Sequence, residues 1–168
     1  MNSAMTGALP PVGDTAWSGS EAAYAASYRD LLRVAYVLTG SAAVAEDVVH
    51  DVFCRVGPRI ATLDNPAAYL RVAVVNQCRS LHRRFARASR LPVGVDTTVG
   101  AGLDTGLTEF SDALQSLPTR QRTAVVLRYL CDLSDDVIAD ILDCRTATVR
   151  SLVHRGLAAL RTQIPRNS

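Results

Sequence analysis

The stretch "AEDVVHDVF", residues 45–53, places three carboxylates and a histidine within nine residues. Asp47 and His50 are three residues apart and Glu46 and His50 are four apart, and both spacings put side chains on one face of a helix. A metal site is therefore geometrically possible, and so is a charged surface that binds another protein.

A second group of side chains is purely cationic. Residues 79–90, "RSLHRRFARASR", contain five arginines and no acid, whereas residues 91–110 contain three acids and no base. At about 100° per residue, one arc of a helix would hold Asn76, Arg79, Arg83, Arg87 and Arg90, which we call the arginine ridge. The opposite face would hold Leu70, Val74, Cys78, Leu81 and Phe85. A solvated helix face is the alternative, but unopposed arginines favour a polyanion such as nucleic acid, since guanidinium groups fork onto phosphate oxygens.

The third group lies in residues 133–161, where two helical patterns are separated by a short break at residues 143–145. Ser134 can cap the first pattern. In the second, Val149, Leu152, Val153, Leu157 and Leu160 would pack inward. The outward side would hold Ala147, Arg150, Ser151, His154, Arg155 and Arg161. This pattern predicts a helix-turn-helix that presents a helix to the DNA major groove, although an ordinary helical hairpin has the same spacing.

The elements that must position these groups are all predicted to be helical. Helical periodicity, with capping and breaking residues at its ends, predicts helices at residues 21–39, 42–56, 66–88, 107–116, 119–131, 134–142 and 146–162. Gly40 can stop the first helix, Ser41 can cap the second, and Asn65 can cap the third. Strand-like alternation of useful length is not found.

The fold class we expect is all-α: two small helical domains joined by a flexible linker, the C-terminal one containing the helix-turn-helix. Composition and the breaks in periodicity divide the chain into a flexible N-terminal arm at 1–20, a domain at 21–90, a linker at 91–106, a domain at 107–162 and a tail at 163–168.

Cysteine spacing and hydropathy exclude several classes. The four cysteines form no Cys-x-x-Cys pair, so we expect neither a disulfide framework nor a zinc module, and no cofactor. The apolar runs fall short of the ~18 residues of a membrane span, and the first 20 residues lack the pattern of a signal peptide. We therefore expect a cytoplasmic protein without membrane insertion.

Taken in order along the chain, these motifs resemble a bacterial RNA polymerase sigma factor of the extracytoplasmic-function (ECF) type. "AEDVVHDVF" resembles region 2.2, and "NPAAYLRVAVVNQCRSLHRR" resembles regions 2.3 and 2.4. "ALQSLPTRQRTAVVLRYL", "LSDDVIADIL" and "TVRSLVHRGLAALR" resemble region 4. The short linker, with no domain inserted, points to the ECF type.

The resemblance implies a protein that is not an enzyme and that binds core RNA polymerase, promoter DNA and an anti-sigma factor. Docking on the clamp coiled coil of the largest polymerase subunit would use Glu46, Asp47, His50 and Asp51, and the flap region would be a second contact. The minus-ten element would meet Tyr69, Asn76, Arg79, Arg83, Arg84 and Arg87. The minus-thirty-five element would meet Arg145, Thr146, Thr148, Arg150, Ser151, His154 and Arg155.

Several positions depart from the family pattern. They are His50 for a usual glutamine, Tyr69 for tryptophan, Val137 for glutamate, Asp143 for a turn glycine, Arg145 for a small capping residue and Leu152 for arginine. We therefore expect Thr146 to cap the last helix in place of Arg145. Two rival hypotheses are a dimeric helix-turn-helix regulator that acts without polymerase and a helical metalloprotein using Glu46, Asp47 and His50. The latter would need ligands from other helices, and the sequence indicates none.

Overall fold

The computed structural model describes residues 21–88 and 105–163, which form helices and the turns between them. The predicted arm, nearly all of the predicted linker, Arg90 and most of the tail lie outside the described residues. In the part of the chain that is described, no helix is both long and apolar enough to cross a membrane.

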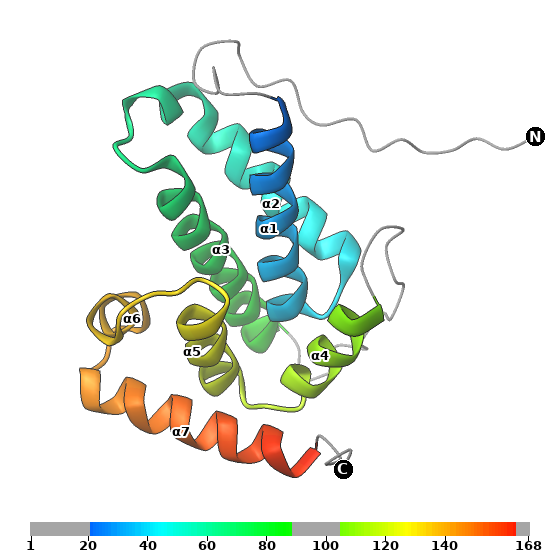
Figure 1. Ribbon diagram of the computed structural model, residues 1–168, viewed down its shortest axis with the longest axis vertical. Helices are drawn as coiled ribbons and strands as arrows, with labels where there is room; N and C mark the ends of the chain where they lie inside the picture. Colours follow the sequence, from blue (N-terminus) through cyan, green and yellow to red (C-terminus); the bar gives the residue numbers. More distant parts are fainter. Residues whose placement is uncertain (1–20, 89–104, 164–168) are drawn as a thin grey trace, which may run out of the picture.

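Three helices form an N-terminal bundle: α1 (Glu21–Thr39), α2 (Ala42–Val56) and α3 (Pro66–Ala88). They run alternately down, up and down in Figure 1. Gly40 separates the first two with a φ of 73°, a conformation that glycine adopts without a steric penalty. The Val44 amide then donates to the Ser41 hydroxyl at 3.4 Å, and the Ala68 amide donates to the Asn65 side chain at 3.1 Å. Both predicted caps are therefore confirmed.

Four helices form a C-terminal bundle: α4 (Thr105–Gln115), α5 (Thr119–Tyr129), α6 (Asp135–Leu142) and α7 (Thr146–Gln163). α5 lies against both α6 and α7, and α7 closes the lower side of the molecule in Figure 1. α4 begins at Thr105, two residues before the predicted start at residue 107.

The buried faces follow the apolar periodicity of the sequence. In α2 the valines at 48, 49, 52 and 56 are buried, and in α3 Leu70, Val74 and Cys78 are buried. Phe85 does not follow this pattern, because its side chain is 45% exposed instead of packed on the inner face. It lies in the last turns of α3, where residues 83–87 are all exposed. A short 3₁₀ helix, η1 (Gly57–Thr62), was also not predicted.

The two bundles touch each other. The C-terminal end of α1 packs against α4 and α5, and the lower end of α3 approaches α5 and α6 (Figure 1). This contact was not predicted from the sequence, which indicated two domains and a linker only.

Candidate nucleic-acid interface

The helix-turn-helix is built from α6, the turn at residues 143–145, and α7. Ser134 caps α6 by accepting a hydrogen bond from the Val137 amide at 3.5 Å, and Asp135 and Asp136 occupy the first turn, where the helix dipole favours negative charge. Asp143 ends α6 in the left-handed region, with φ 49° and ψ 62°. Glycine is the usual residue in this conformation at the end of a helix. Asp143 adopts the same conformation, so the departure from the family pattern does not change the backbone of the turn.

A glycine sets the distance between α7 and α5. A Cβ atom added at Gly156 would lie 2.8 Å from Cγ2 of Val125, which is closer than carbon atoms can approach. Gly156 and Leu152 are buried on this inner side. The inner side of α7 therefore determines how closely the helix packs on α5, and its outer side is available for other contacts.

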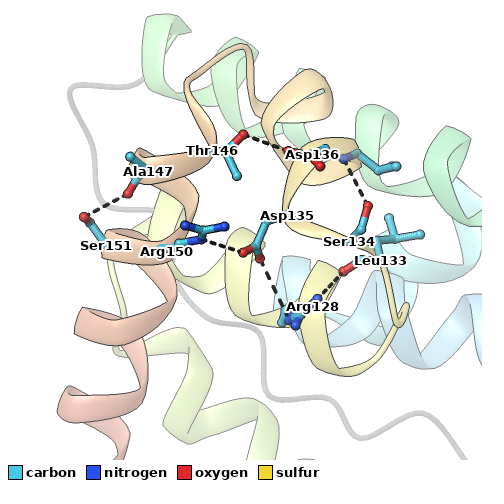
Figure 2. A network of polar contacts seen from close by, with 10 residues as sticks. Arg128, Leu133, Ser134, Asp135, Asp136, Thr146, Ala147, Arg150 and Ser151 are labelled. Atoms are coloured by element: carbon cyan, nitrogen blue, oxygen red, sulfur yellow. Dashed lines mark hydrogen bonds and ion pairs between the residues drawn. The ribbon is translucent and has the colours of Figure 1, made fainter.

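The outer side of α7 carries the predicted DNA-contacting residues, and we call it the reading face. Its exposed members are Arg145, Ala147, Arg150, Ser151, His154 and Arg155, while Thr146 and Thr148 are half-buried. Arg150 Nε donates to the Asp135 carboxylate at 3.1 Å, and Arg155 Nε donates to the Ser151 carbonyl at 3.2 Å. Figure 2 shows Arg150 reaching from α7 towards the start of α6.

The predicted cap of α7 was wrong. The Arg145 carbonyl accepts from the amides of Thr148 and Val149 at 2.8 and 3.2 Å, so Arg145 holds the position that precedes the helix. Thr146 is the first helical residue, and its hydroxyl donates instead to the Asp136 carboxylate at 2.9 Å (Figure 2). The hydroxyl that we expected to cap α7 is therefore bonded to a carboxylate of α6 instead.

The arginine ridge runs along α3 and is exposed over most of its described length. Asn76, Arg83 and Arg87 are exposed, and so is Arg84 beside them. Arg79 differs, because it is half-buried and its Nη1 donates to the Ile141 carbonyl near the end of α6.

Two other arginines act on the charge of Arg79. Burial lowers the pKa of its guanidinium, and Arg83 and Arg120 lower it further, while Asp143 acts in the opposite direction. Arg120 itself donates to the Leu142 carbonyl at 3.2 Å. Two arginines, one from each bundle, therefore bind the carbonyls at the C-terminal end of α6, where the helix dipole favours cations.

A second contact between the bundles is made at the C-terminal end of α1. Gln115 Nε2 donates to the Val37 carbonyl at 2.8 Å, and Arg122 Nη1 donates to the Leu38 carbonyl at 3.0 Å. Nε2 of His82, from α3, lies 2.9 Å from the same Leu38 carbonyl. These carbonyls have no partners within the helix, so side chains from both bundles supply them.

Arg122 is the central residue of this contact. Its guanidinium is buried and also donates to the carbonyls of Leu114, Gln115 and Leu117 at 3.0 to 3.2 Å. Burial lowers its pKa. Sequence reasoning missed Arg122, because the predicted helix at residues 119–131 gives no local sign of which of its arginines is buried.

The acidic face of α2 consists of Glu46, Asp47, His50 and Asp51, and all four side chains are exposed. Nε2 of His50 lies 3.5 Å from Sγ of Cys54 one turn further along the helix. Among the residues that the structure describes, no group of three or more potential metal ligands comes together. The face is therefore an open charged surface.

Tyr69 lies exposed on the first turn of α3, and its hydroxyl accepts a hydrogen bond from Arg59 Nη2 at 2.9 Å. The Arg59 guanidinium carbon is also 5.8 Å from the ring centroid. Arg59 was not predicted, since it comes from the 3₁₀ helix that the sequence did not reveal. It adds a cation beside the only aromatic side chain predicted to meet the minus-ten element.

Comparison with known proteins places both bundles in one family. Residues 23–88 match the family described as Sigma-70 region 2, and residues 107–160 match Sigma-70, region 4. The chain is 31% identical over 165 residues to the ECF RNA polymerase sigma factor SigL of Mycobacterium tuberculosis, an alignment that covers 86% of this chain and 92% of that protein. The chain belongs to the ECF family of RNA polymerase sigma factors.

Two further comparisons differ in extent. SigW, an ECF RNA polymerase sigma factor of Bacillus subtilis, is 40% identical over 60 residues, which span 33% of this chain and only 32% of SigW. The sigma factor RpoE, solved in complex with the anti-sigma factor NepR from Bartonella quintana, has the same fold. It superposes with a TM-score of 0.69 at 22% identity, over 88% of this chain and 98% of that one.

Proposed function

We propose that this sigma factor binds core RNA polymerase, recognises a promoter at its minus-ten and minus-thirty-five elements, and starts transcription there without catalysing a reaction itself. The observation that carries the proposal is the presence of two separate arginine-bearing helical surfaces, on α3 and α7, in one chain of this family. A dimeric regulator acting without polymerase is less well supported, because it leaves the exposed acidic face of α2 without a role.

The acidic face of α2 is the proposed docking surface for polymerase. Glu46, Asp47, His50 and Asp51 would contact the clamp coiled coil of the largest subunit, and the C-terminal bundle would contact the flap region. All four side chains are exposed and come from a helix whose other face is held in the core, so they are presented on a rigid support.

The minus-ten element is proposed to bind along the arginine ridge. Asn76, Arg83, Arg84 and Arg87 are exposed there, and the exposed Tyr69 would stack on a base that melting has extruded. Arg79 would join them only after its bond to the Ile141 carbonyl is broken.

The minus-thirty-five element is proposed to bind the reading face of α7. Arg150 is the principal base reader, with Thr148, Ser151 and His154 beside it and Arg155 on phosphate. Arg145 and Thr146 lie at the start of the helix, but the Thr146 hydroxyl is already bonded to Asp136. Thr146 is therefore a weaker candidate for a direct DNA contact than its neighbours.

An anti-sigma factor would act on the contact between the bundles. In the arrangement described, the C-terminal bundle holds Arg79, so the bundles must separate before the whole ridge can reach DNA. A partner that binds both bundles together would keep that contact closed and prevent promoter binding.

The test is run-off transcription with purified core polymerase on a library of promoters. The chain should co-migrate with core enzyme and direct it to start sites that core alone does not use. Asp47→Arg should weaken co-migration, whereas Asp30→Arg, which makes the same charge change at an exposed position of α1, should not. A chain that neither joined core enzyme nor redirected it would overturn the proposal, and tight promoter binding without polymerase would favour the dimeric regulator.

A further inference from the structure

Arg150 is held in place by the helix that precedes it. Its Nε atom donates to Oδ2 of Asp135 at 3.1 Å, although 72% of the Arg150 side chain is exposed. A long exposed arginine usually samples many rotamers, so a specific bond to a partner on another element restricts where its guanidinium lies.

The atom used in this bond decides which part of the guanidinium remains available. Arginine can present two parallel N–H groups either along the edge that includes Nε or across the two terminal nitrogens. Because Asp135 occupies Nε, the terminal pair, Nη1 and Nη2, is left to meet an acceptor pair. Guanine offers such a pair, O6 and N7, in the major groove.

Asp135 is itself fixed. It lies in the first turn of α6 next to the capping residue Ser134, and only 23% of its side chain is exposed. Nε of Arg128 lies 4.0 Å from the other carboxylate oxygen, and Arg128 Nη1 is held by the Leu133 carbonyl at 3.1 Å (Figure 2). The carboxylate therefore connects α5, α6 and α7.

The charges in this group remain favourable for DNA. One carboxylate lies between two arginines, Arg128 and Arg150, so the group as a whole keeps a positive charge. The bond also joins α6 to α7 beside the parallel bond from Thr146 to Asp136. Both carboxylates at the start of α6 thus bind side chains at the start of α7.

We infer that Asp135 is a positioning residue for promoter recognition, which holds Arg150 by Nε so that its terminal nitrogens are aimed at a guanine of the minus-thirty-five element. This inference rests on the proposed function. The alternative is that Asp135 masks Arg150 by neutralising it, and the two predict opposite effects of removing the carboxylate.

The experiment measures start-site selection by the full-length chain with core polymerase on promoters randomised across the minus-thirty-five element. Arg150→Ala should abolish the preference for guanine at one position. Asp135→Ala should reduce the preference at that same position, by roughly three- to tenfold, and leave the other positions unchanged. Asp135→Asn, which keeps an acceptor oxygen, should recover part of the preference.

The double variant Asp135→Ala/Arg150→Ala should discriminate no worse than Arg150→Ala alone, because the carboxylate acts only through the arginine. Asp140→Ala is the matched control, since it removes one exposed carboxylate from the same helix, and it should leave the preference intact. Thermal unfolding of each variant separates loss of positioning from loss of folding, and Asp135→Asn serves if Asp135→Ala does not fold.

The outcomes are distinct. An unchanged preference in Asp135→Ala, or a gain in affinity for all sequences alike, would overturn the inference while leaving the proposed function in place. If the wild-type chain directs no specific initiation, the proposed function fails and the inference fails with it.

Discussion

The two arginine surfaces that we propose for DNA binding differ in how many of their side chains are available. The reading face of α7 is exposed, and its principal arginine is already oriented by a carboxylate of the same bundle. The ridge on α3 is exposed at most of its described positions, but Arg79 is bound to a carbonyl of the other bundle. The surface proposed for the minus-thirty-five element is thus fully exposed in the arrangement described, whereas the surface proposed for the minus-ten element would be completed only when the bundles separate.

The largest effect on the contact between the bundles should come from removing Arg122, which bonds to both of them. Arg122→Ala would leave four backbone carbonyls without their shared donor, at the ends of α1 and α4. We expect the free energy of unfolding to fall by about 3 kcal/mol, measured by urea denaturation. Arg161→Ala, an exposed arginine on α7, should change it by less than about 0.5 kcal/mol. Equal effects of the two substitutions would contradict the central role of Arg122.

The two surfaces should also differ in what a lost arginine does to binding. Arg150→Ala should cost about 1 to 3 kcal/mol on promoters with the preferred base and little on others. Arg83→Ala should weaken binding to many promoters and reduce the slope of log affinity against log salt by about 1. Titrations of holoenzyme with several promoters at several salt concentrations measure both. An equal loss on every sequence for Arg150→Ala would refute its role as a base reader.

A smaller change should loosen the contact without damaging either bundle. Gln115→Ala removes the hydrogen bond to the Val37 carbonyl, which we expect to weaken the contact by about 1 kcal/mol. The radius of gyration from small-angle X-ray scattering should rise. Gln163→Ala, which removes only a bond to Ser116 within the C-terminal bundle, is the control and should leave it unchanged. A radius that did not rise would mean that the remaining contacts hold the bundles closed.

The smallest expected effect is a pH dependence centred on His82. Burial lowers its pKa and nearby Arg122 lowers it further, while its bond to the Leu38 carbonyl opposes both. Because the unfolded chain then binds the proton more readily than the folded one, stability should fall as the pH drops below about 6.5, the ordinary value for histidine. Urea denaturation between pH 7.5 and 5.5 measures this, and His82→Gln should flatten the dependence. A dependence of the same size in His82→Gln would assign it to other groups.

Local features of the sequence predicted the helices and the exposed side of α7 well. Gly40, Ser41, Asn65 and Ser134 mark helix ends by their own backbone and side-chain chemistry, and the 3.6-residue period separates the inner and outer sides of α7. These signals involve residues close together in the chain, so they can be recognised without a structure.

The contacts that the sequence did not reveal depend on distant partners. Arg122 is buried because carbonyls from α1 and α4 meet at one place. Arg122 and its acceptor Leu38 are 84 positions apart in the sequence. Thr146 has the right chemistry to cap a helix, but Asp136 takes its hydroxyl. In each case the side chain has more than one use, and only the tertiary arrangement decides between them.

The close approach at Gly156 has a practical consequence for engineering. Because α7 packs against Val125 through the side that carries Gly156, substitutions on the opposite side should leave this packing unchanged. Promoter preference should therefore be exchangeable by swapping a few outward residues together with Asp135, without transplanting a whole domain. The same packed core could then carry different outward residues. Variants made in this way could each direct polymerase to a separate set of genes.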